Sequence, residues 1–280
     1  MKAKSIKPIS ILLLLSLIFL LYFTAASGEQ APWDCPECGR TGNTGNFCGG
    51  CAHPAPAPEP PAQDFRTIGN IVTFGHYEQD IDATNGQEEI EWIVLDFDEK
   101  EQKALLLSKY GLDVKPYNTT NLDVTWEKCS LRNWLNGEFL QTAFTSEERA
   151  AILITTAGNS SSQGYSQWHT EGGKNTLDQI FLLSYTEANR YLDVTADNHN
   201  NTKARVAPTA FAAARGADCL GTVQTVDGKS AGWWWLRSPG SYQFFAASVI
   251  NDGSLSNDSV DLGSNVIRPA LWINLESDIF

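Results

Sequence analysis

The stretch that most constrains how this 280-residue chain folds is residues 232–275, because its two ends and its middle differ in composition. The left frame, residues 232–240 (GWWWLRSPG), is aromatic, prone to β structure and closed by a Pro-Gly turn signal. The right frame, residues 267–275 (IRPALWINL), has the pattern of a closing strand. We expect both frames in the core, with Trp234 and Trp272 buried there.

Between the frames, the insert (residues 241–266) alternates Ser, Asn, Asp and Gly with single apolar residues, and it contains no Lys, Arg, Glu, Met or Trp. Such an insert cannot be a core strand along its whole length.

The two frames, together with the steps Ala246-Ala247-Ser248-Val249 and Asp252-Gly253-Ser254-Leu255, resemble the C-terminal variable region of proteins diversified by diversity-generating retroelements. The resemblance covers roughly residues 70–280 and is most specific in the frames. It implies an α+β domain of the C-type-lectin-like, or formylglycine-generating-enzyme-like, type over residues 65–280, with few helices, short strands and long loops. The variable region would be residues 240–267.

In that family, adenine-directed mutagenesis produces codons that mostly end in a pyrimidine and cannot encode Lys, Glu, Gln, Met or Trp. The resemblance implies a fixed framework at Gln243, Ala246, Ala247, Val249, Asp252, Gly253, Leu255 and Val260. It implies variable, ligand-binding positions at Ser241, Tyr242, Phe244, Phe245, Ser248, Ile250, Asn251, Ser256, Asn257, Asp258, Ser259, Asp261, Leu262, Ser264 and Asn265. None of these is an excluded residue type. The alternative is an ordinary polar loop, since a loop rich in Ser, Asn and Asp also tends to lack Lys and Met.

The chain begins with an export segment, residues 1–27. Three Lys in the first seven residues precede a nearly unbroken apolar run, 8–23, and then small residues. The run is short for a membrane-spanning helix and long for the core of a signal peptide. The small residues favour cleavage, and a retained membrane anchor is the alternative. Because the positive flank stays in the cytoplasm, the rest of the chain is expected outside, either secreted or on the cell surface.

Residues 28–53 contain two C-x-x-C pairs, Cys35/Cys38 and Cys48/Cys51. Each tight turn presents two thiolates, and four thiolates surround a structural zinc ion tetrahedrally. The pairs resemble the short zinc ribbons found beside membrane segments in bacterial proteins. The spacing therefore predicts one structural zinc ion, and two disulfides are the alternative because an exported chain meets an oxidising milieu.

A Pro-rich segment, residues 54–64, predicts an extended linker to the main domain. In that domain we expect strands at 71–77, 90–96 and 103–108. We expect helices to begin at Ser130, as N-cap, near Thr145 and at Ser184, where Glu187 completes a capping box. Two further cysteines, Cys129 and Cys219, form either one disulfide or two free thiols.

Composition and motifs argue against several classes of function. A net charge of −13 and a pI near 4.7 disfavour nucleic acid and anionic membrane surfaces as partners. The four His show no metal-ligand spacing, there is no G-x-S-x-G elbow, and no Cys follows Cys219, whereas formylglycine-generating enzymes use a C-terminal pair of Cys. The step Asn251-Asp252 lacks the Trp or Glu that flanks calcium sites in lectins.

We therefore expect no catalysis but an exported binding protein, whose partner is an unknown protein or glycan at a cell surface or phage. Membrane contact would come only through an uncleaved N-terminal segment. Tyr and Phe in the insert offer contact area at low entropy cost, while Ser and Asn adapt their hydrogen bonds. Phe244 or Phe245 could instead be core, since successive strand residues face opposite sides. The alternatives are a fixed carbohydrate- or protein-binding lectin-like domain and, less favoured, an enzyme related to formylglycine-generating enzymes.

Overall fold

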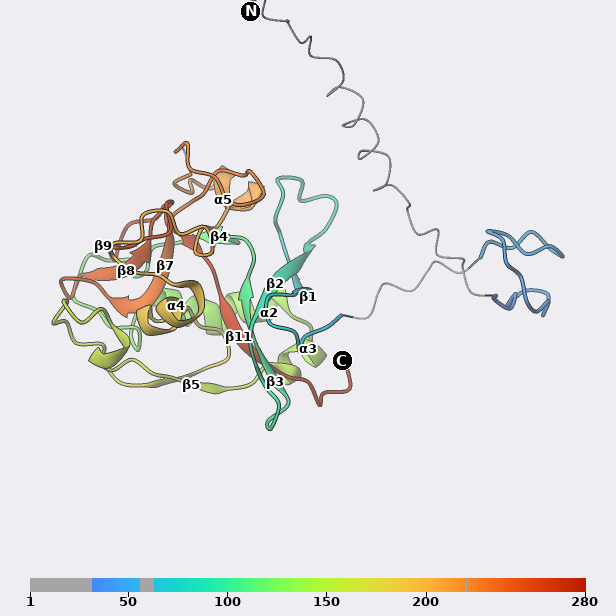
Figure 1. Ribbon diagram of the computed structural model, residues 1–280, viewed down its shortest axis with the longest axis horizontal. Coiled ribbons are helices and arrows are strands. Elements are labelled where there is room, and N and C mark those ends of the chain that lie inside the picture. The colour runs from blue at the N-terminus through green and yellow to red at the C-terminus, as the bar shows by residue number, and fades with distance from the viewer. Residues whose placement is uncertain (1–31, 56–62, 220) are drawn as a thin grey trace, which may run out of the picture. The chain divides into compact units, whose positions relative to one another are not determined.

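The computed structural model describes residues 32–55, 63–219 and 221–280 (Figure 1). These described residues form two compact units, one within Met1–Ala62 and one within Gln63–Phe280. The expected export segment, residues 1–27, lies outside the described residues, as does most of the expected linker. Among the described residues, no helix combines the length and the hydropathy that crossing a membrane requires.

The second unit is a mixed α+β structure in which curled sheets predominate and helices are few and short (Figure 1). Its elements in chain order are β1 (Ile71–Tyr77), β2 (Glu88–Asp98), β3 (Lys103–Ser108), β4 (Asp113–Val114), α1 (Ser130–Trp134), the π-helix η1 (Leu135–Phe139), α2 (Leu140–Ala143), α3 (Ser146–Ala151), β5 (Thr155–Ala157), the 3-10 helix η2 (Ser161–Gln163), β6 (Thr176–Asp178), α4 (Tyr185–Leu192), α5 (Ala210–Ala214), β7 (Trp234–Pro239), β8 (Phe245–Val249), β9 (Leu255–Ser259), β10 (Val266–Ile267) and β11 (Ala270–Asn274).

Three sheets organise these strands. One has four strands in the order β1-β2-β3-β11, one has five in the order β4-β10-β7-β8-β9, and β5 pairs with β6 alone. Neighbours are antiparallel except β10 and β7, which run parallel. The expected strands at 71–77 and 103–108 are confirmed as β1 and β3, and the right frame closes the first sheet as β11.

The left frame supplies the central strand of the five-stranded sheet; Trp234 is fully buried, as expected, and so is Trp235, whereas Trp233 is half-buried. The indole N–H of Trp234 donates to the carbonyl of Ala204 at 3.0 Å, and that of Trp235 donates to the carbonyl of Lys115 at 3.0 Å. Because both polar tips have partners, the two rings can be buried without leaving an unpaired donor. This anchors β7 as the support on which the insert is built.

Trp272 packs against the core, as expected, but it is not fully buried there. Its neighbours Leu271 and Ile273 are buried, but Trp272 is only half-buried, and the Lys103 ammonium lies 5.0 Å from the centre of its ring. Successive strand residues point to opposite faces, so Trp272 lies on the other face of β11 from Leu271 and Ile273, at the edge of the core. The ammonium of Lys103, a residue of the adjacent strand β3, lies over the partly open ring as a cation–π contact.

The helix expected from Ser130 exists, but its N-cap is Cys129 rather than Ser130. The sulfur of Cys129 accepts the Arg132 N–H at 3.4 Å, while the Ser130 hydroxyl accepts the N–H of Thr119 at 3.0 Å. The capping boxes at Thr145 and at Ser184 are both present. The helix α5 was not expected from the sequence.

Cys129 and Cys219 are both free thiols in this structure, so the disulfide alternative is not found. Burial raises the pKa of Cys129 to about 12, which keeps this thiol protonated and leaves it the role of a small apolar group that also caps a helix.

Candidate functional site

The insert forms the outer half of the five-stranded sheet. Strand β8 pairs with β7 on one side and with β9 on the other, and β9 is the last strand of the order. In Figure 1 these three strands lie together, next to the α4 helix. The insert is therefore one hairpin with loops at both ends, attached to the buried left frame.

The residues of the hairpin divide by burial. Among the expected framework positions, Gln243 and Asp252 are half-buried and the others are buried: Ala246, Ala247, Val249, Gly253, Leu255 and Val260. Among the candidate variable positions, Tyr242, Phe244, Asp261 and Leu262 are exposed, and the half-buried ones are Ser241, Phe245, Ile250, Asn251, Ser256, Asn257, Asp258, Ser259 and Ser264. Only Ser248 and Asn265 lie in the interior.

Gln243 ties the loop between β7 and β8 to two other loops. Its side-chain amide donates to the main-chain carbonyl of Val124 at 3.1 Å and to that of Glu171 at 3.0 Å. The main-chain carbonyl of Gln243 accepts the Val124 N–H at 3.2 Å. An amide side chain is needed for this bridge, since one NH₂ group supplies both donors. The single Gln of the insert thus has a structural role.

The turn between β8 and β9 is fixed by Asp252 and Gly253. The Asp252 carboxylate accepts two hydrogen bonds from Ser254, one from its N–H at 2.9 Å and one from its hydroxyl at 2.7 Å. Gly253 has φ +90°, and a Cβ there would lie 2.1 Å from the carbonyl oxygen of Asn201. Both the backbone conformation and the close approach require glycine at this position. One carboxylate oxygen of Asp252 is thus engaged within its own turn, and the other lies 3.3 Å from Nδ1 of His199.

An aromatic cluster projects from the start of the hairpin. The rings of Tyr242 and Phe244 stack with centroids 5.6 Å apart, and Phe245 meets both edge-on at 5.7 Å and 4.9 Å. Tyr242 is 60% exposed and Phe244 37% exposed, and Leu122 on a neighbouring loop lines a shallow depression with Phe244. Neither Phe is fully buried: Phe244 precedes β8, and Phe245, the first residue of that strand, is half-buried. The cluster offers a solvent-facing apolar surface.

The two interior candidates carry unsatisfied polar atoms. The hydroxyl of Ser248 and the side-chain oxygen of Asn265 are buried with no hydrogen-bond partner in the described part of the chain, although the Asn265 amide donates to Asp258 at 2.9 Å. A buried polar atom without a partner costs about 1–3 kcal/mol. Stability alone does not favour Ser and Asn at these two positions.

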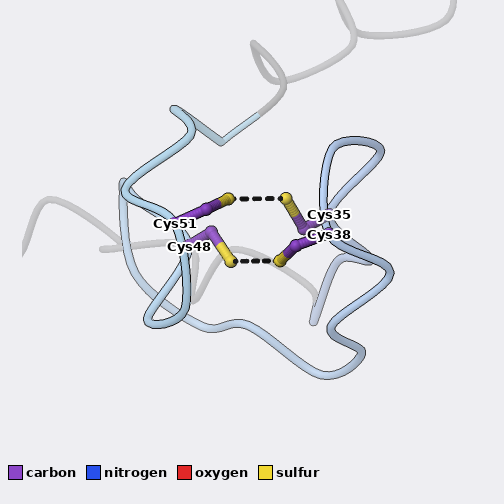
Figure 2. Close-up of side chains that lie close together, drawn as sticks. All are labelled: Cys35, Cys38, Cys48 and Cys51. Atoms are coloured by element: carbon purple, nitrogen blue, oxygen red, sulfur yellow. Dashed lines mark hydrogen bonds between the residues drawn. The ribbon is translucent and has the colours of Figure 1, made fainter.

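The second candidate site is the four-cysteine cluster of the first unit. The sulfurs of Cys35, Cys38, Cys48 and Cys51 all lie within 4.8 Å of one another, with Cys35 3.5 Å from Cys51 and Cys38 3.5 Å from Cys48 (Figure 2). Zinc–sulfur bonds of 2.3 Å in a tetrahedron place sulfurs about 3.8 Å apart. The cluster is compatible with a zinc site, and all four residues are free thiols.

Backbone groups of the second knuckle tune these thiols. The N–H of Gly50 donates to the Cys48 sulfur at 3.4 Å and, with the N–H of Cys51, lowers the pKa of Cys48 to about 6. The His53 N–H lowers the pKa of Cys51, but hydrogen bonds with Cys35 and the other thiols, together with burial, outweigh it and raise that pKa to about 12. A central cation would stabilise four thiolates at this separation.

One group was missed in the sequence. Glu78 and Asp80 of the loop between β1 and β2, and Glu88 at the start of β2, bring carboxylate oxygens within 4.8 Å of one another. Burial and the nearby Glu88 carboxylate raise the pKa of Glu78. The other two carboxylates already accept hydrogen bonds from the loop. The Gln79 N–H donates to Glu88 at 2.7 Å, and the Asn85 side-chain amide donates to Asp80 at 2.9 Å. These contacts hold the end of the β1–β2 hairpin in shape. The sequence spacing of the three residues did not indicate the cluster, because they come together only through the conformation of the turn.

Comparisons with known proteins give one result for the second unit. A family model described as Domain of unknown function (DUF6273) matches residues 101–275, more than half of the chain. The match begins within the β2–β3 hairpin and ends at the last residue of the right frame, so it includes the insert and both frames. Searches of curated proteins and of solved structures found no match.

Proposed function

The chain belongs to the family described as Domain of unknown function (DUF6273), and on that premise we propose that it is an exported binding protein whose C-terminal surface is diversified to fit varied targets. The target would be a protein or glycan at a cell surface or phage, and no catalysis is involved. A diversity-generating retroelement would produce this variation. The two frames resemble those of its target proteins, and the candidate positions of the insert hold only residue types that its codons can encode.

The observation that carries this proposal is the division of the insert by burial. Framework residues fill the interior or brace the loops, whereas the candidate variable residues are exposed or half-buried except for Ser248 and Asn265. A surface that changes sequence without unfolding needs this division, since exposed substitutions usually alter stability by within about 0.5 kcal/mol. Ser248 and Asn265 each bury an oxygen without a hydrogen-bond partner, which is expected of residues that were not selected for stability.

The chemistry of the exposed set suits recognition. The Tyr242, Phe244 and Phe245 cluster would supply contact area, while Asn251 and Asn257 would supply adaptable donors and acceptors. Asn257 already accepts both the N–H and the hydroxyl of Ser241 at 2.7 Å, so part of this surface is ordered before any ligand arrives. Preordered contacts reduce the entropy lost on binding.

We further propose that the second unit has a C-type-lectin-like, or formylglycine-generating-enzyme-like, arrangement, in keeping with its short strands, few helices and long loops. We propose one structural zinc ion for the four cysteines Cys35, Cys38, Cys48 and Cys51. With the apolar N-terminal segment and the Pro-rich linker, the zinc-stapled unit would hold the binding domain away from the cell surface, in an extracytoplasmic location.

The nucleotide sequence around the gene tests the proposed origin. A near-copy of the segment that encodes residues 235–275 should lie close by, beside a reverse transcriptase, with adenines wherever the gene differs from it. Codons for Gly240, Gln243, Asp252 and Gly253 should be identical in both copies. Absence of a second copy, or differences scattered over non-adenine positions, would instead support a fixed lectin-like surface.

A further inference from the structure

A cavity of about 650 Å³ lies in the second unit, and none of its lining residues belongs to the insert. Four cationic side chains line it, against one carboxylate, that of Asp227: the cations are Lys109, Lys203, Arg205 and Arg268. In a chain with a net charge of −13, such a local excess of positive charge runs against the overall composition. It favours an anion over any other ligand class.

The two lysines already have acidic partners beside the cavity. Lys109 pairs with Glu91 at 3.2 Å, and Lys203 pairs with Asp193 at 2.6 Å. Their charges are therefore largely balanced within the chain. The uncompensated charge comes from the two arginines, neither of which forms an ion pair among the described residues.

Arg268 is 1% exposed, yet only carbonyl oxygens meet its guanidinium. Its Nε donates to Ser108 at 3.0 Å and its Nη1 to Ala204 at 3.5 Å, while the Trp234 ring centre lies 5.0 Å away. Carbonyls and a ring face satisfy some of its donors without neutralising its charge. A buried charge without a counter-ion is unusual, since buried charges are normally paired.

Arg205 is likewise incompletely satisfied. Its Nη2 donates to the Asn200 side chain at 2.6 Å and its Nη1 donates to the Gln224 carbonyl at 2.9 Å, but its buried Nε has no partner within the described ranges. Buried donors in native proteins almost always have one. Of the two arginines that line the cavity, Arg205 thus carries a donor without a partner and Arg268 a charge without a counter-ion.

We propose that this cavity binds a small organic acid, with its carboxylate on Arg205 and Arg268 and its apolar body against Ile71, Ile93 and Tyr110. The planar guanidinium matches a carboxylate in shape and hydrogen-bond direction. The apolar lining and the volume suit a molecule with a carbon skeleton rather than a bare inorganic ion. This site is separate from the proposed diversified surface.

Calorimetric titration of the full chain with benzoate, and with its uncharged analogue benzamide, tests the proposal. Benzoate should bind saturably, and benzamide should bind at least tenfold more weakly because it lacks the charge. Arg205→Gln should weaken benzoate binding at least tenfold. Arg190→Gln is the matched control, since Arg190 is exposed, lies outside the cavity and should leave benzoate affinity unchanged.

Several outcomes overturn the proposal: no saturable benzoate binding to the wild-type chain, equal affinity for benzoate and benzamide, or unchanged affinity in Arg205→Gln. If inorganic phosphate bound as tightly as benzoate, the proposal that the ligand has an apolar organic body would be contradicted. An Arg268→Gln variant that keeps its melting temperature should lose benzoate binding as well. If that variant unfolds, Arg205→Gln decides alone, because Arg205 is only half-buried.

Discussion

Arg237 of β7 and Glu187 of α4 form a two-point ion pair in which the arginine side chain is 1% exposed. Its Nη2 donates to Oε1 of Glu187 at 2.8 Å, and its Nη1 donates to the other carboxylate oxygen. The Nη2 group also donates to the Gly158 carbonyl at 3.0 Å, and the Nη1 group donates to the Leu182 carbonyl at 2.7 Å. One arginine of the left frame thereby joins the central strand, a helix and two loops.

Replacing Glu187 by Gln should therefore destabilise the fold strongly. Removing one partner of a buried pair leaves an uncompensated charge and costs about 3–5 kcal/mol. Denaturant unfolding of the full chain measures this cost. The matched control is Glu147→Gln, since Glu147 is an exposed residue of a helix first turn and its loss should cost well under 1 kcal/mol. Equal stability of the two variants would contradict a structural role for the pair.

The same pair predicts a pH dependence. Burial raises the pKa of Glu187, but the charge of Arg237 and the hydrogen bonds outweigh it, so the pKa lies below its usual value. A depressed carboxyl pKa contributes stability that is present above the unfolded-state pKa, about 4.3, and lost as the pH falls through the folded-state pKa. Unfolding measured from pH 7 down to pH 3 should thus show the wild type losing its advantage over Glu187→Gln below about pH 4. If the difference in unfolding free energy between the two proteins stayed constant over this pH range, the ion pair would not be its source.

Gly253→Ala should destabilise the turn between β8 and β9. The positive φ costs a side chain about 1–3 kcal/mol, and the clash with the Asn201 carbonyl adds to it. Thermal unfolding should therefore shift by several degrees. Gly263→Ala provides the comparison, because a Cβ there meets nothing within 4 Å and φ is not positive. Similar melting temperatures for both variants would mean that this turn is not held as described.

Tyr242→Ser combined with Phe244→Ser should leave the melting temperature within a few degrees of the wild type, because both rings are substantially exposed. Trp234→Ala should instead cost about 3–5 kcal/mol, because it empties a fully buried site. Differential scanning calorimetry compares the three proteins. Unfolding of the double serine variant at low temperature would show that the aromatic cluster belongs to the core.

Local patterns in the sequence predicted local structure well. The strands β1 and β3, the capping box at Ser184 and the buried Trp234 all follow from alternation or from spacing within a few residues. The N-cap was misplaced by one residue because a thiol, rather than the adjacent hydroxyl of Ser130, accepts the helix N–H. Sequence preferences for caps do not rank Cys highly, so tertiary packing decided that position.

Long-range contacts were beyond the reach of these patterns. The partner of Arg237 lies fifty positions away, and the environment of Arg268 is built from loops that approach only after folding. The burial of Ser248 could not be read from its polarity, since it is set by β8 lying between two strands. The clustering of four sulfurs followed from spacing because each C-x-x-C turn fixes two of them.

Metal analysis of the reduced full chain should find one equivalent of zinc. Cys48→Ser should lower that content sharply, while Cys219→Ser, a thiol outside the cluster, should not. Since protons compete with zinc for thiolates, zinc affinity should fall as the pH falls from 7 to 5. Two disulfides detected by mass spectrometry in the native protein, with no zinc, would reverse the assignment.

That the insert is a diversified ligand-binding surface is tested most directly by deep sequencing of codons 232–275 in a population of the native host. Amino-acid changes should be confined to the fifteen candidate codons and should arise at adenines, while Gln243, Asp252, Gly253 and both frames stay constant. Changes spread evenly over framework and candidate codons, or a single invariant sequence in every cell, would contradict it.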